Sequence, residues 1–437
     1  MATAWKLLRE GRAARPTLLL LTGAYGLQYL DRMLVGLFAP SIKADLALSD
    51  TQIGLITGVA FSLFYVVASL PLARLADRWD RKTIVVASLA AMSVATAVFG
   101  AMGTLAGLFV ARACVAIGEA GATPTSVSLL AGLYDSRQRQ IAMSLYSGGG
   151  FAGMAVALSA LALLSDMFGW RQIFQLAGVV GLVFAILLAW RLPATPRVTP
   201  AAAGFARVQW RLLRIPSFTL LSLGLSAALL GSAAGTNWVA SFLSRSYGMA
   251  QGEILLFLAA AWGGGALLGT VVFGSANARL RGRGARGPLA MLALAVLGFA
   301  SAYVVAFTAR TPGASLAGIA VALFCIGGLR GPTFALVQDI VPDAHQAAGN
   351  ALLLVMTFLI GSMLGPLLTG VISDALTPRL GPEALRAALF GVLTTGGGAS
   401  LLLLAAAGWF VERDIAGKGA DTPSPWRGEG DSRQRAG

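Results

Sequence analysis

"RLADRWDRK" (Arg74–Lys82) is a short charged stretch that separates two long apolar runs, at 52–74 and 83–103. Each run has the roughly 20 apolar residues that a helix needs to cross the hydrocarbon core of a bilayer. A charged stretch between two such runs is typical of a loop at one face of a membrane. This part of the sequence therefore predicts a helical hairpin that spans a bilayer.

The composition of the whole chain agrees with a membrane protein. Of its 437 residues, 57% are hydrophobic and only 12% are charged, whereas about 25% is usual for soluble proteins. The net charge of +14 is spread over short loops rather than gathered on one folded face, so we expect no nucleic-acid partner. With one histidine and two cysteines about 200 residues apart, the chain lacks the spacing of a metal site, and we expect no cofactor other than a coupling proton.

Apolar runs of spanning length recur along the chain. We place them at 17–40, 52–74, 83–103, 105–133, 141–164, 170–191, 217–243, 252–277, 288–309, 314–338, 347–374 and 384–411. The sequence thus predicts an all-α integral membrane protein with twelve transmembrane helices.

The distribution of basic residues gives an independent test of this topology. If both termini are cytoplasmic, 24 of the 33 Lys and Arg residues lie in inner segments and six lie in outer loops. The remaining three, Arg32, Arg112 and Arg330, fall inside predicted helices. Because inner loops of membrane proteins are enriched in Lys and Arg, this bias supports twelve helices with both ends inside.

The chain divides into two similar halves. The Pro-rich and basic segment 193–216 predicts a cytoplasmic linker with a short interfacial helix at 205–213, between bundles at 17–192 and 217–411. We expect a cytoplasmic tail at 1–16 and a disordered one at 412–437. Two Ser-Asp pairs, Ser165-Asp166 and Ser373-Asp374, are 208 residues apart, as are Gly153 and Gly361. Such repeats predict two pseudo-symmetric six-helix bundles, a common plan of secondary transporters.

The loop that follows the second predicted helix resembles a known signature. "ARLADRWDRK" (Ala73–Lys82) is similar to the G-x-L-A-D-R-x-G-R-K loop of the major facilitator superfamily. It departs from that pattern at Ala73 and Asp80, where glycines are usual, and keeps the charged residues of the motif. The resemblance implies a transporter fold that works by alternating access.

Other stretches are similar to the Spinster family of lysolipid and sphingolipid transporters within that superfamily. These are "YLDRM" with the run that follows it to Tyr65, "GEAGATP" (Gly118–Pro124) and "GWRQIF" (Gly169–Phe174). The organic anion:cation symporters share the Tyr-x-Asp-Arg and Gly-Glu-Ala pieces and remain the nearest rival. The specific motifs cover about residues 25–175, and the second half matches only the superfamily architecture.

The resemblance also implies a cytoplasmic gate. Asp77 would lie against the N-terminus of the eleventh helix when the inner side is closed, where the helix dipole favours an acid. The gate would also include Arg78, Arg81 and Arg139. From its depth in the tenth helix, we expect Arg330 to line the gate or to be structural. The second half has Ala278 at the position that corresponds to Asp77, so this latch is expected in the first half alone.

Five ionisable residues lie well inside predicted helices: Asp31, Arg32, Arg112, Glu119 and Arg330. Charges inside a membrane are unfavourable, so they usually face a cavity, pair with each other and mark a transport pathway. With a rise of 1.5 Å per residue, Asp31 and Arg112 lie at about the same depth, which predicts an ion pair. By the same count Glu119 is roughly 10 Å deeper and lacks a basic partner on its own helix. Arg330 would lie nearer the cytoplasmic mouth.

These positions suggest roles for the charged residues. Arginine offers a planar fork that matches carboxylate or phosphate, so Arg32 and Arg112 are candidate contacts for a substrate headgroup. A poorly paired carboxylate in a low-dielectric cavity binds a proton more readily than in water, so we expect Glu119 to be the main proton carrier. Asp31 would be the second proton-coupling residue, a switchable partner that frees Arg32 or Arg112 when a substrate or a proton arrives. The alternative is a static ion-pair cluster that only joins helices 1 and 4. The polar and aromatic residues expected to line the substrate site are Tyr29, Tyr65, Asn237 and Trp238.

Together these features predict a monomeric, proton-coupled secondary transporter in the cytoplasmic membrane. Helices 7, 8 and 11 consist mostly of Ala, Leu, Gly and Ser, which favours an anionic or zwitterionic amphipathic lipid as substrate. The alternative is a proton symporter for a small organic anion such as a sugar acid. A non-transporting membrane sensor ranks lower, because no soluble output domain is evident. We expect no enzyme activity, because the sequence has no recognisable nucleophile, metal site or base.

Overall fold

The computed structural model describes residues 15–134, 136–192, 205–342 and 345–419. Our predictions for the N-terminal tail, for most of the linker and for the end of the C-terminal tail fall outside these ranges. Within them, all of the regular structure is helical.

The N-terminal half consists of six helical rods, where a rod is one continuous or nearly continuous helical segment. They are α2 (Arg15–Leu37), the run α4–η1–α5 (Asp50–Gly54, Leu55–Val59, Ala60–Arg78), α6 (Arg81–Ala101), α7 (Leu105–Leu133), α8 (Ser136–Leu164) and α9 (Trp170–Arg191). A short helix, α3 (Ala39–Leu46), lies between the first two rods.

The C-terminal half repeats this plan. Its rods are α11 (Pro216–Tyr247), the run α12–η2–α13 (Gln251–Ala260, Ala261–Ala266, Leu267–Leu280), α14 (Arg286–Thr308), α15 with α16 (Pro312–Ile326, Arg330–Ile340), the run α17–η5–α18 (Gln346–Met356, Thr357–Ser362, Met363–Leu380) and α19 (Ala384–Gly419). The single turns η3 (Arg281–Arg283) and η6 (Gly381–Glu383) and the short helix α10 (Phe205–Leu212) complete the described structure.

The helix count agrees with the prediction of twelve spans. Among the described residues, ten helical stretches are long and apolar enough to cross a membrane, and the last of them, Gln346–Lys418, contains two rods that meet at η6. The twelfth rod is α2, which is less apolar because it carries Gln28, Asp31 and Arg32. The rod bounds lie within a few residues of the predicted runs. The main exception is α19, which continues to Gly419, into the segment assigned to the tail.

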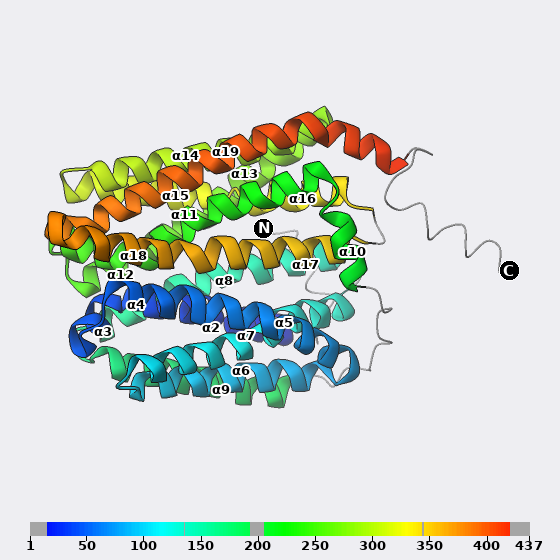
Figure 1. The fold of residues 1–437 in the computed structure, drawn as a ribbon. Coiled ribbons are helices and arrows are strands. Elements are labelled where there is room, and N and C mark those ends of the chain that lie inside the picture. Colours follow the sequence, from blue (N-terminus) through cyan, green and yellow to red (C-terminus); the bar gives the residue numbers. More distant parts are fainter. Residues whose placement is uncertain (1–14, 135, 193–204, 343–344, 420–437) are drawn as a thin grey trace.

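The two halves lie side by side with their rods roughly parallel (Figure 1). The N-terminal half, coloured blue to cyan-green, and the C-terminal half, coloured green to red, each form one side of the molecule. We refer to the end at which α3 lies and α4 begins as the predicted outer end, and to the end at which α5 stops and α10 lies as the predicted inner end. The interfacial helix expected at 205–213 is present as α10.

Small residues bring the first and fifth rods of each half into close contact. A Cβ atom added to Gly26 of α2 would lie 3.1 Å from Gly153 Cα of α8, and one added to Gly361 would lie 2.7 Å from Leu229 Cβ of α11. Both positions therefore need glycine for the backbones to approach. Gly153 and Gly361, the repeat pair of the sequence, thus both lie where the fifth rod of a half meets the first rod of the same half.

A group of charged residues joins the halves at the predicted outer end. Asp50, which is buried at the start of α4, accepts two hydrogen bonds from Arg245 of α11, each 2.7 Å long. Its carboxylate also bonds to Lys43 at 2.5 Å and accepts a hydrogen bond from Ser373 of α18 at 2.7 Å. We call Lys43, Asp50, Arg245, Ser373 and Asp374 the outer lock.

Asp374 completes the outer lock by capping α4. Its two carboxylate oxygens accept hydrogen bonds from the backbone N–H groups of Asp50, at 3.0 Å, and Thr51, at 2.7 Å. These N–H groups have no partner inside the helix, and the positive end of the helix dipole favours an acid here. The α18 helix of one half therefore stabilises the first turn of α4 in the other half.

The other Ser-Asp pair, Ser165-Asp166, lies at the place in the repeat that corresponds to Ser373-Asp374. A Cβ atom added to Gly252, near the start of α12, would lie 3.7 Å from Asp166 Oδ1 and 3.7 Å from Ser165 Oγ, in the turn after α8. Ser165-Asp166 thus lies just after the fifth rod of its half and Ser373-Asp374 lies within the last turns of the fifth rod of the other half. Each pair is beside the N-terminus of the second rod of the opposite half. The repeat found in the sequence is therefore a repeat of contacts between the halves.

We predict that Asp50→Asn lowers the apparent melting temperature of the purified protein. The change leaves Arg245 and Lys43 without an anion in a largely buried place, which costs about 3 kcal/mol. The measurement is tryptophan fluorescence during thermal unfolding in detergent. The matched control is Asp45→Asn, whose ion pair with Arg171 is partly exposed and contributes about 0–1 kcal/mol. Equal melting of both variants would contradict the role of the outer lock.

Candidate substrate and proton site

The structure brings the five intramembrane charges into one neighbourhood. Asp31 and Arg32 are on α2, Arg112 and Glu119 are on α7, and Arg330 is the first residue of α16. Four of them form two ion pairs, one between Arg112 and Asp31 and the other between Arg32 and Glu119. The cluster therefore has two separate pairs and one further arginine.

The predicted ion pair between Asp31 and Arg112 is confirmed. Arg112 Nη1 donates to Asp31 Oδ2 at 3.1 Å and to the backbone oxygen of Asp31 at 3.1 Å. Its Nη2 donates to the backbone oxygen of Arg32 at 2.9 Å. The guanidinium carbon of Arg112 also lies 4.7 Å from the centre of the Phe61 ring. Arg112 is 2% exposed, so its charge is neutralised entirely within the N-terminal half.

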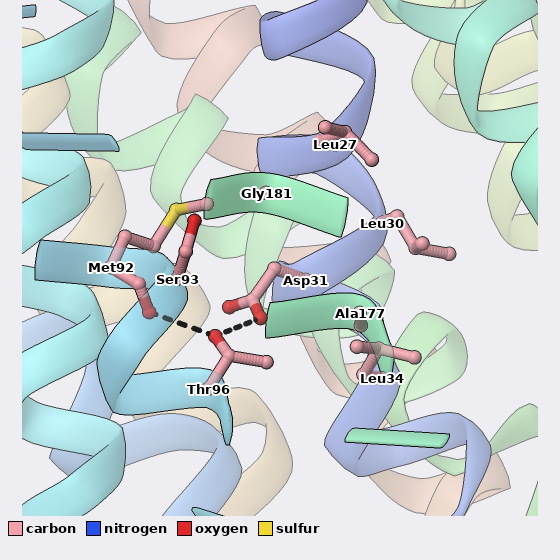
Figure 2. Close-up of a pocket in the computed structure, with 9 residues that line it drawn as sticks. All are labelled: Leu27, Leu30, Asp31, Leu34, Met92, Ser93, Thr96, Ala177 and Gly181. Atoms are coloured by element: carbon pink, nitrogen blue, oxygen red, sulfur yellow. Dashed lines mark hydrogen bonds between the residues drawn. The ribbon is translucent and has the colours of Figure 1, made fainter. Parts of the chain in front are cut away.

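Asp31 points into the N-terminal half. Figure 2 shows its carboxylate directed from α2 toward Thr96 of α6, which donates a hydrogen bond of 2.6 Å to Oδ1. Beside it is a cavity of about 20 Å³, lined by residues of α2, α6 and α9 that include Ser93 and Gly181, and large enough for one water molecule. Every partner of Asp31 among the described residues belongs to this half, so these contacts favour a structural role in which the Asp31–Arg112 pair joins α2 to α7.

Glu119 has no basic partner on its own helix, as expected, but it is paired with Arg32 of α2, which depth counting did not predict. Arg32 Nε donates to Glu119 Oε1. Depths counted from Cα atoms miss this pair because side chains on a helix lean toward its N-terminus. The helices α2 and α7 are antiparallel, so Arg32 leans toward the predicted inner end and Glu119 toward the outer end. The two side chains close the gap of roughly 10 Å between their levels.

Glu119 is only half satisfied by this pair. Its side chain is fully buried, and Oε2 has no hydrogen-bond partner among the described residues. A buried carboxylate oxygen without a partner is unfavourable when the group is ionised. The geometry therefore favours proton binding by the Glu119 carboxylate.

Aromatic rings from both halves surround Arg32. Its guanidinium carbon lies 5.5–5.8 Å from the ring centres of Tyr29, Phe61, Tyr65 and Phe358, within the range of cation–π attraction. Tyr65 of α5 and Phe358 of η5 are stacked with their centres 4.6 Å apart. The Arg32–Glu119 pair thus lies at the boundary between the halves, in contrast to the Asp31–Arg112 pair.

The backbone of Arg330 lies nearer the predicted inner end of its rod, as expected, but its side chain contacts the central cluster. Its Nη2 donates to the hydroxyl of Tyr29, three residues before Arg32 on α2. The reason is again the direction of side chains: Tyr29 leans toward the predicted inner end and Arg330 toward the outer end. Arg330 therefore joins the central cluster from the C-terminal half, and its expected part in the cytoplasmic gate stays a prediction.

Two of the residues expected at the substrate site are elsewhere. Trp238 is buried and donates from Nε1 to the backbone oxygen of Pro366 at 3.1 Å, so it joins α11 to α18. Asn237 donates to the backbone oxygen of Ala233 on its own helix, and its backbone packs against Gly36 of α2. Both were chosen as polar groups in an apolar helix, and they serve packing between helices. Tyr29 and Tyr65 do reach the cluster.

The proposed cytoplasmic gate is described only in part. The side chains of Asp77 and Arg78 lie outside the described part of the structure. Arg81 lies beside Gly132 of α7, and Arg139 donates to the backbone oxygen of Tyr134 at 3.5 Å. The latch of Asp77 on the eleventh helix stays a prediction.

Residues that the sequence did not reveal complete the cluster. They are Phe61, Thr96 and Phe358, which contact Arg112, Asp31 and Arg32 respectively. Phenylalanine and threonine are ordinary in apolar helices, so composition gives no signal for them. Only the packing of α5, α6 and η5 around α2 identifies these residues.

Twelve helical rods in two similar halves, with paired charges between them, define a multi-pass membrane protein of the transporter type. The family model described as Major Facilitator Superfamily matches residues 21–366. The chain therefore belongs to the major facilitator superfamily, whose members are transporters and not enzymes.

Several individual members of the superfamily are similar to this chain. An MFS-type efflux pump of Mycolicibacterium smegmatis is 32% identical over 369 residues, 83% of this chain and 85% of that protein. A probable L-galactonate transporter of Escherichia coli is 30% identical over 178 residues, 41% of this chain and 39% of that protein. A crystal structure of a bacterial homologue of the human lysosomal transporter Spinster, inward-facing and unoccupied, covers 93% of this chain and 98% of its own, with a TM-score of 0.77 and 26% identity. The resemblance to Spinster proteins is thus confirmed.

We predict that Arg112→Gln lowers the apparent melting temperature strongly. Removal of one partner from a buried ion pair costs about 3–5 kcal/mol because the other charge stays buried. The double variant Asp31→Asn/Arg112→Gln should be more stable than the sum of the two single effects. Thermal unfolding of all three variants measures this coupling.

Arg286→Gln is the control for this cycle, because Arg286 and Glu412 form a pair of which both members are exposed. Such a pair contributes about 0–1 kcal/mol. Strictly additive effects of Asp31→Asn and Arg112→Gln would show that the two side chains do not stabilise each other.

Proposed function

We propose that this chain is a proton-coupled secondary transporter that moves an anionic or zwitterionic amphipathic lipid by alternating access. It would act in the cytoplasmic membrane with both termini inside, as the distribution of Lys and Arg suggests. The observation on which the proposal depends is the Arg32–Glu119 pair, which lies between the halves and leaves one buried carboxylate oxygen without a partner.

Protonation of Glu119 would change the charge of the cluster. With both acids ionised, the five residues sum to +1, and with Glu119 protonated they sum to +2. Loss of the carboxylate charge weakens the hold on Arg32, whose guanidinium then becomes available to an anion. Proton binding and anion binding are thereby linked through one arginine.

The outer lock supports a state that is closed on the outside. The described hydrogen bonds between the halves cluster at the predicted outer end, where Asp50, Arg245 and Asp374 meet. Alternating access requires these bonds to break when the substrate site opens outward. The similarity to a Spinster homologue in its inward-facing form agrees with this assignment.

The choice of a lipid is supported by the apolar surroundings of the cluster and by the Spinster similarity over nearly the whole chain. A small organic anion is the second candidate. It is favoured by relatives named as sugar-acid transporters, each of which matches about two fifths of this chain. Both candidates offer an anionic group to the arginines.

We predict that Glu119→Gln abolishes lipid transport driven by a pH gradient but retains exchange without a gradient. Glutamine resembles the protonated acid and keeps the shape of the side chain, so the substrate site survives while proton binding is lost. The measurement is the movement of labelled oleoyl-lysophosphatidic acid across proteoliposomes with and without an imposed gradient.

The control for this assay is Glu253→Gln, since Glu253 is an exposed acid in the first turn of α12. It should transport as the wild type does. Gradient-driven transport that persists in Glu119→Gln would rule out Glu119 as the proton carrier.

A thermal-shift measurement separates the two substrate classes. We expect oleoyl-lysophosphatidic acid to raise the melting temperature of the wild-type protein more than galactonate does, with each ligand at a concentration that saturates its site. The physical reason is that an acyl chain buries apolar surface in addition to the ionic contact. Stabilisation by galactonate alone would contradict the lipid assignment and favour the sugar-acid alternative.

A further inference from the structure

Within the described part of the chain, four of the five intramembrane charges form ion pairs, and the fifth, Arg330, does not. Asp31 is paired with Arg112 and Glu119 with Arg32, and each of the two pairs is electrically neutral. The net charge of +1 in the cluster therefore belongs to Arg330. This arginine has no carboxylate within ion-pair distance among the described residues.

The known contacts of Arg330 are with tyrosine. Its Nη2 donates to the hydroxyl of Tyr29, and its guanidinium carbon lies 5.7 Å from the centre of the same ring. A neutral hydroxyl and a ring face attract a cation but do not cancel its charge. The five donors of the guanidinium outnumber its contacts with the hydroxyls of Tyr29 and Tyr25, so it can bind a further acceptor.

Arg330 is also exposed, which is unusual for an arginine in the middle of a membrane rod. It lies ten residues before the end of α16 at Ile340, about 15 Å from that end at 1.5 Å per residue. An unpaired cation at such a depth is unfavourable, and intramembrane charges of this kind usually mark a ligand or ion pathway. An anion that binds here would supply the missing charge.

Arg32, from the neighbouring Arg32–Glu119 pair, could provide a second contact to an anion bound at Arg330. The guanidinium carbon of Arg32 also lies 5.7 Å from the Tyr29 ring centre, so the two guanidinium carbons are at most 11.4 Å apart, twice that distance. Arg32 belongs to the N-terminal half and Arg330 to the C-terminal half. An oxyanion between them would connect the halves through Tyr29.

We propose that Arg330 is the residue that first binds the anionic group of the substrate, a phosphate or a carboxylate, and that it shares this group with Arg32 once Glu119 is protonated. This assignment depends on the proposed function and adds a recognition residue from the C-terminal half. The two arginines have different roles: Arg330 binds the anionic group first, and Arg32 becomes available to it when Glu119 binds a proton.

A purely structural role for Arg330 makes a different prediction about stability. If Arg330 held the halves together through Tyr29, its replacement would lower the melting temperature of the ligand-free protein. If it is an unpaired cation that awaits an anion, Arg330→Gln should melt at or above the wild-type temperature, because an unfavourable charge is removed. Stability and binding should therefore move independently in this variant.

The experiment measures binding by purified protein in detergent, using tryptophan fluorescence. The three probes are oleoyl-lysophosphatidic acid, the uncharged monooleoylglycerol with the same acyl chain, and galactonate. The variants are Arg330→Gln, Arg330→Lys and the control Arg310→Gln, which removes an exposed arginine between α14 and α15.

We expect the wild type and Arg310→Gln to prefer the lysophosphatidic acid over the uncharged lipid. Arg330→Gln should lose about tenfold or more of this preference, since it removes a charge-assisted hydrogen bond. Arg330→Lys should keep part of it, because a lysine retains the charge without the fork. The uncharged lipid should bind all variants equally.

The remaining outcomes separate the two proposals. If the wild type binds galactonate alone and Arg330→Gln loses that binding, the role of Arg330 holds and the lipid assignment fails. If Arg330→Gln binds the anion as tightly as the wild type, or if its ligand-free form is strongly destabilised, the role of Arg330 is overturned while the proposed function stands. If the wild type shows no preference for either anion over the uncharged lipid, both proposals are overturned.

Discussion

The guanidinium of Arg112 bonds to three oxygen atoms of α2, two from Asp31 and one from the backbone of Arg32. Because its donors have a fixed planar geometry, these bonds set both the height and the rotation of α7 against α2. A slip of either helix would leave a buried charge unpaired, at a cost of several kcal/mol. The position of Glu119 follows, since it lies two turns along the same face of α7 as Arg112.

The two ion pairs differ in what surrounds them, and this difference separates structure from function. Asp31 and Arg112 have partners in the N-terminal half, so their contacts can persist when the halves move. Arg32 contacts Phe358 of the other half, and Tyr65 is stacked on the same ring. Movement between the halves must change the surroundings of the Arg32–Glu119 pair. The Arg32–Glu119 pair, at the boundary between the halves, is therefore the ion pair that can respond to this movement.

Apolar runs and loop charges were sufficient to predict the twelve helices, and the internal repeat pointed to two similar halves. Depth counting found the Asp31–Arg112 pair because both residues lie at one level. It missed the Arg32–Glu119 pair and the contact of Arg330 with Tyr29, since long side chains on antiparallel helices lean toward each other. Trp238 was misassigned because a polar group in an apolar helix can serve a backbone carbonyl as readily as a substrate.

We propose that Glu119 takes up the proton while Asp31 stays ionised in its pair with Arg112. Infrared difference spectroscopy of the carboxyl stretching band during acidification tests this most directly, in the wild type, Glu119→Gln and Asp31→Asn. We expect a protonated-carboxyl band that is present in the wild type and in Asp31→Asn and absent in Glu119→Gln. A band that persists in Glu119→Gln and disappears in Asp31→Asn would contradict the account.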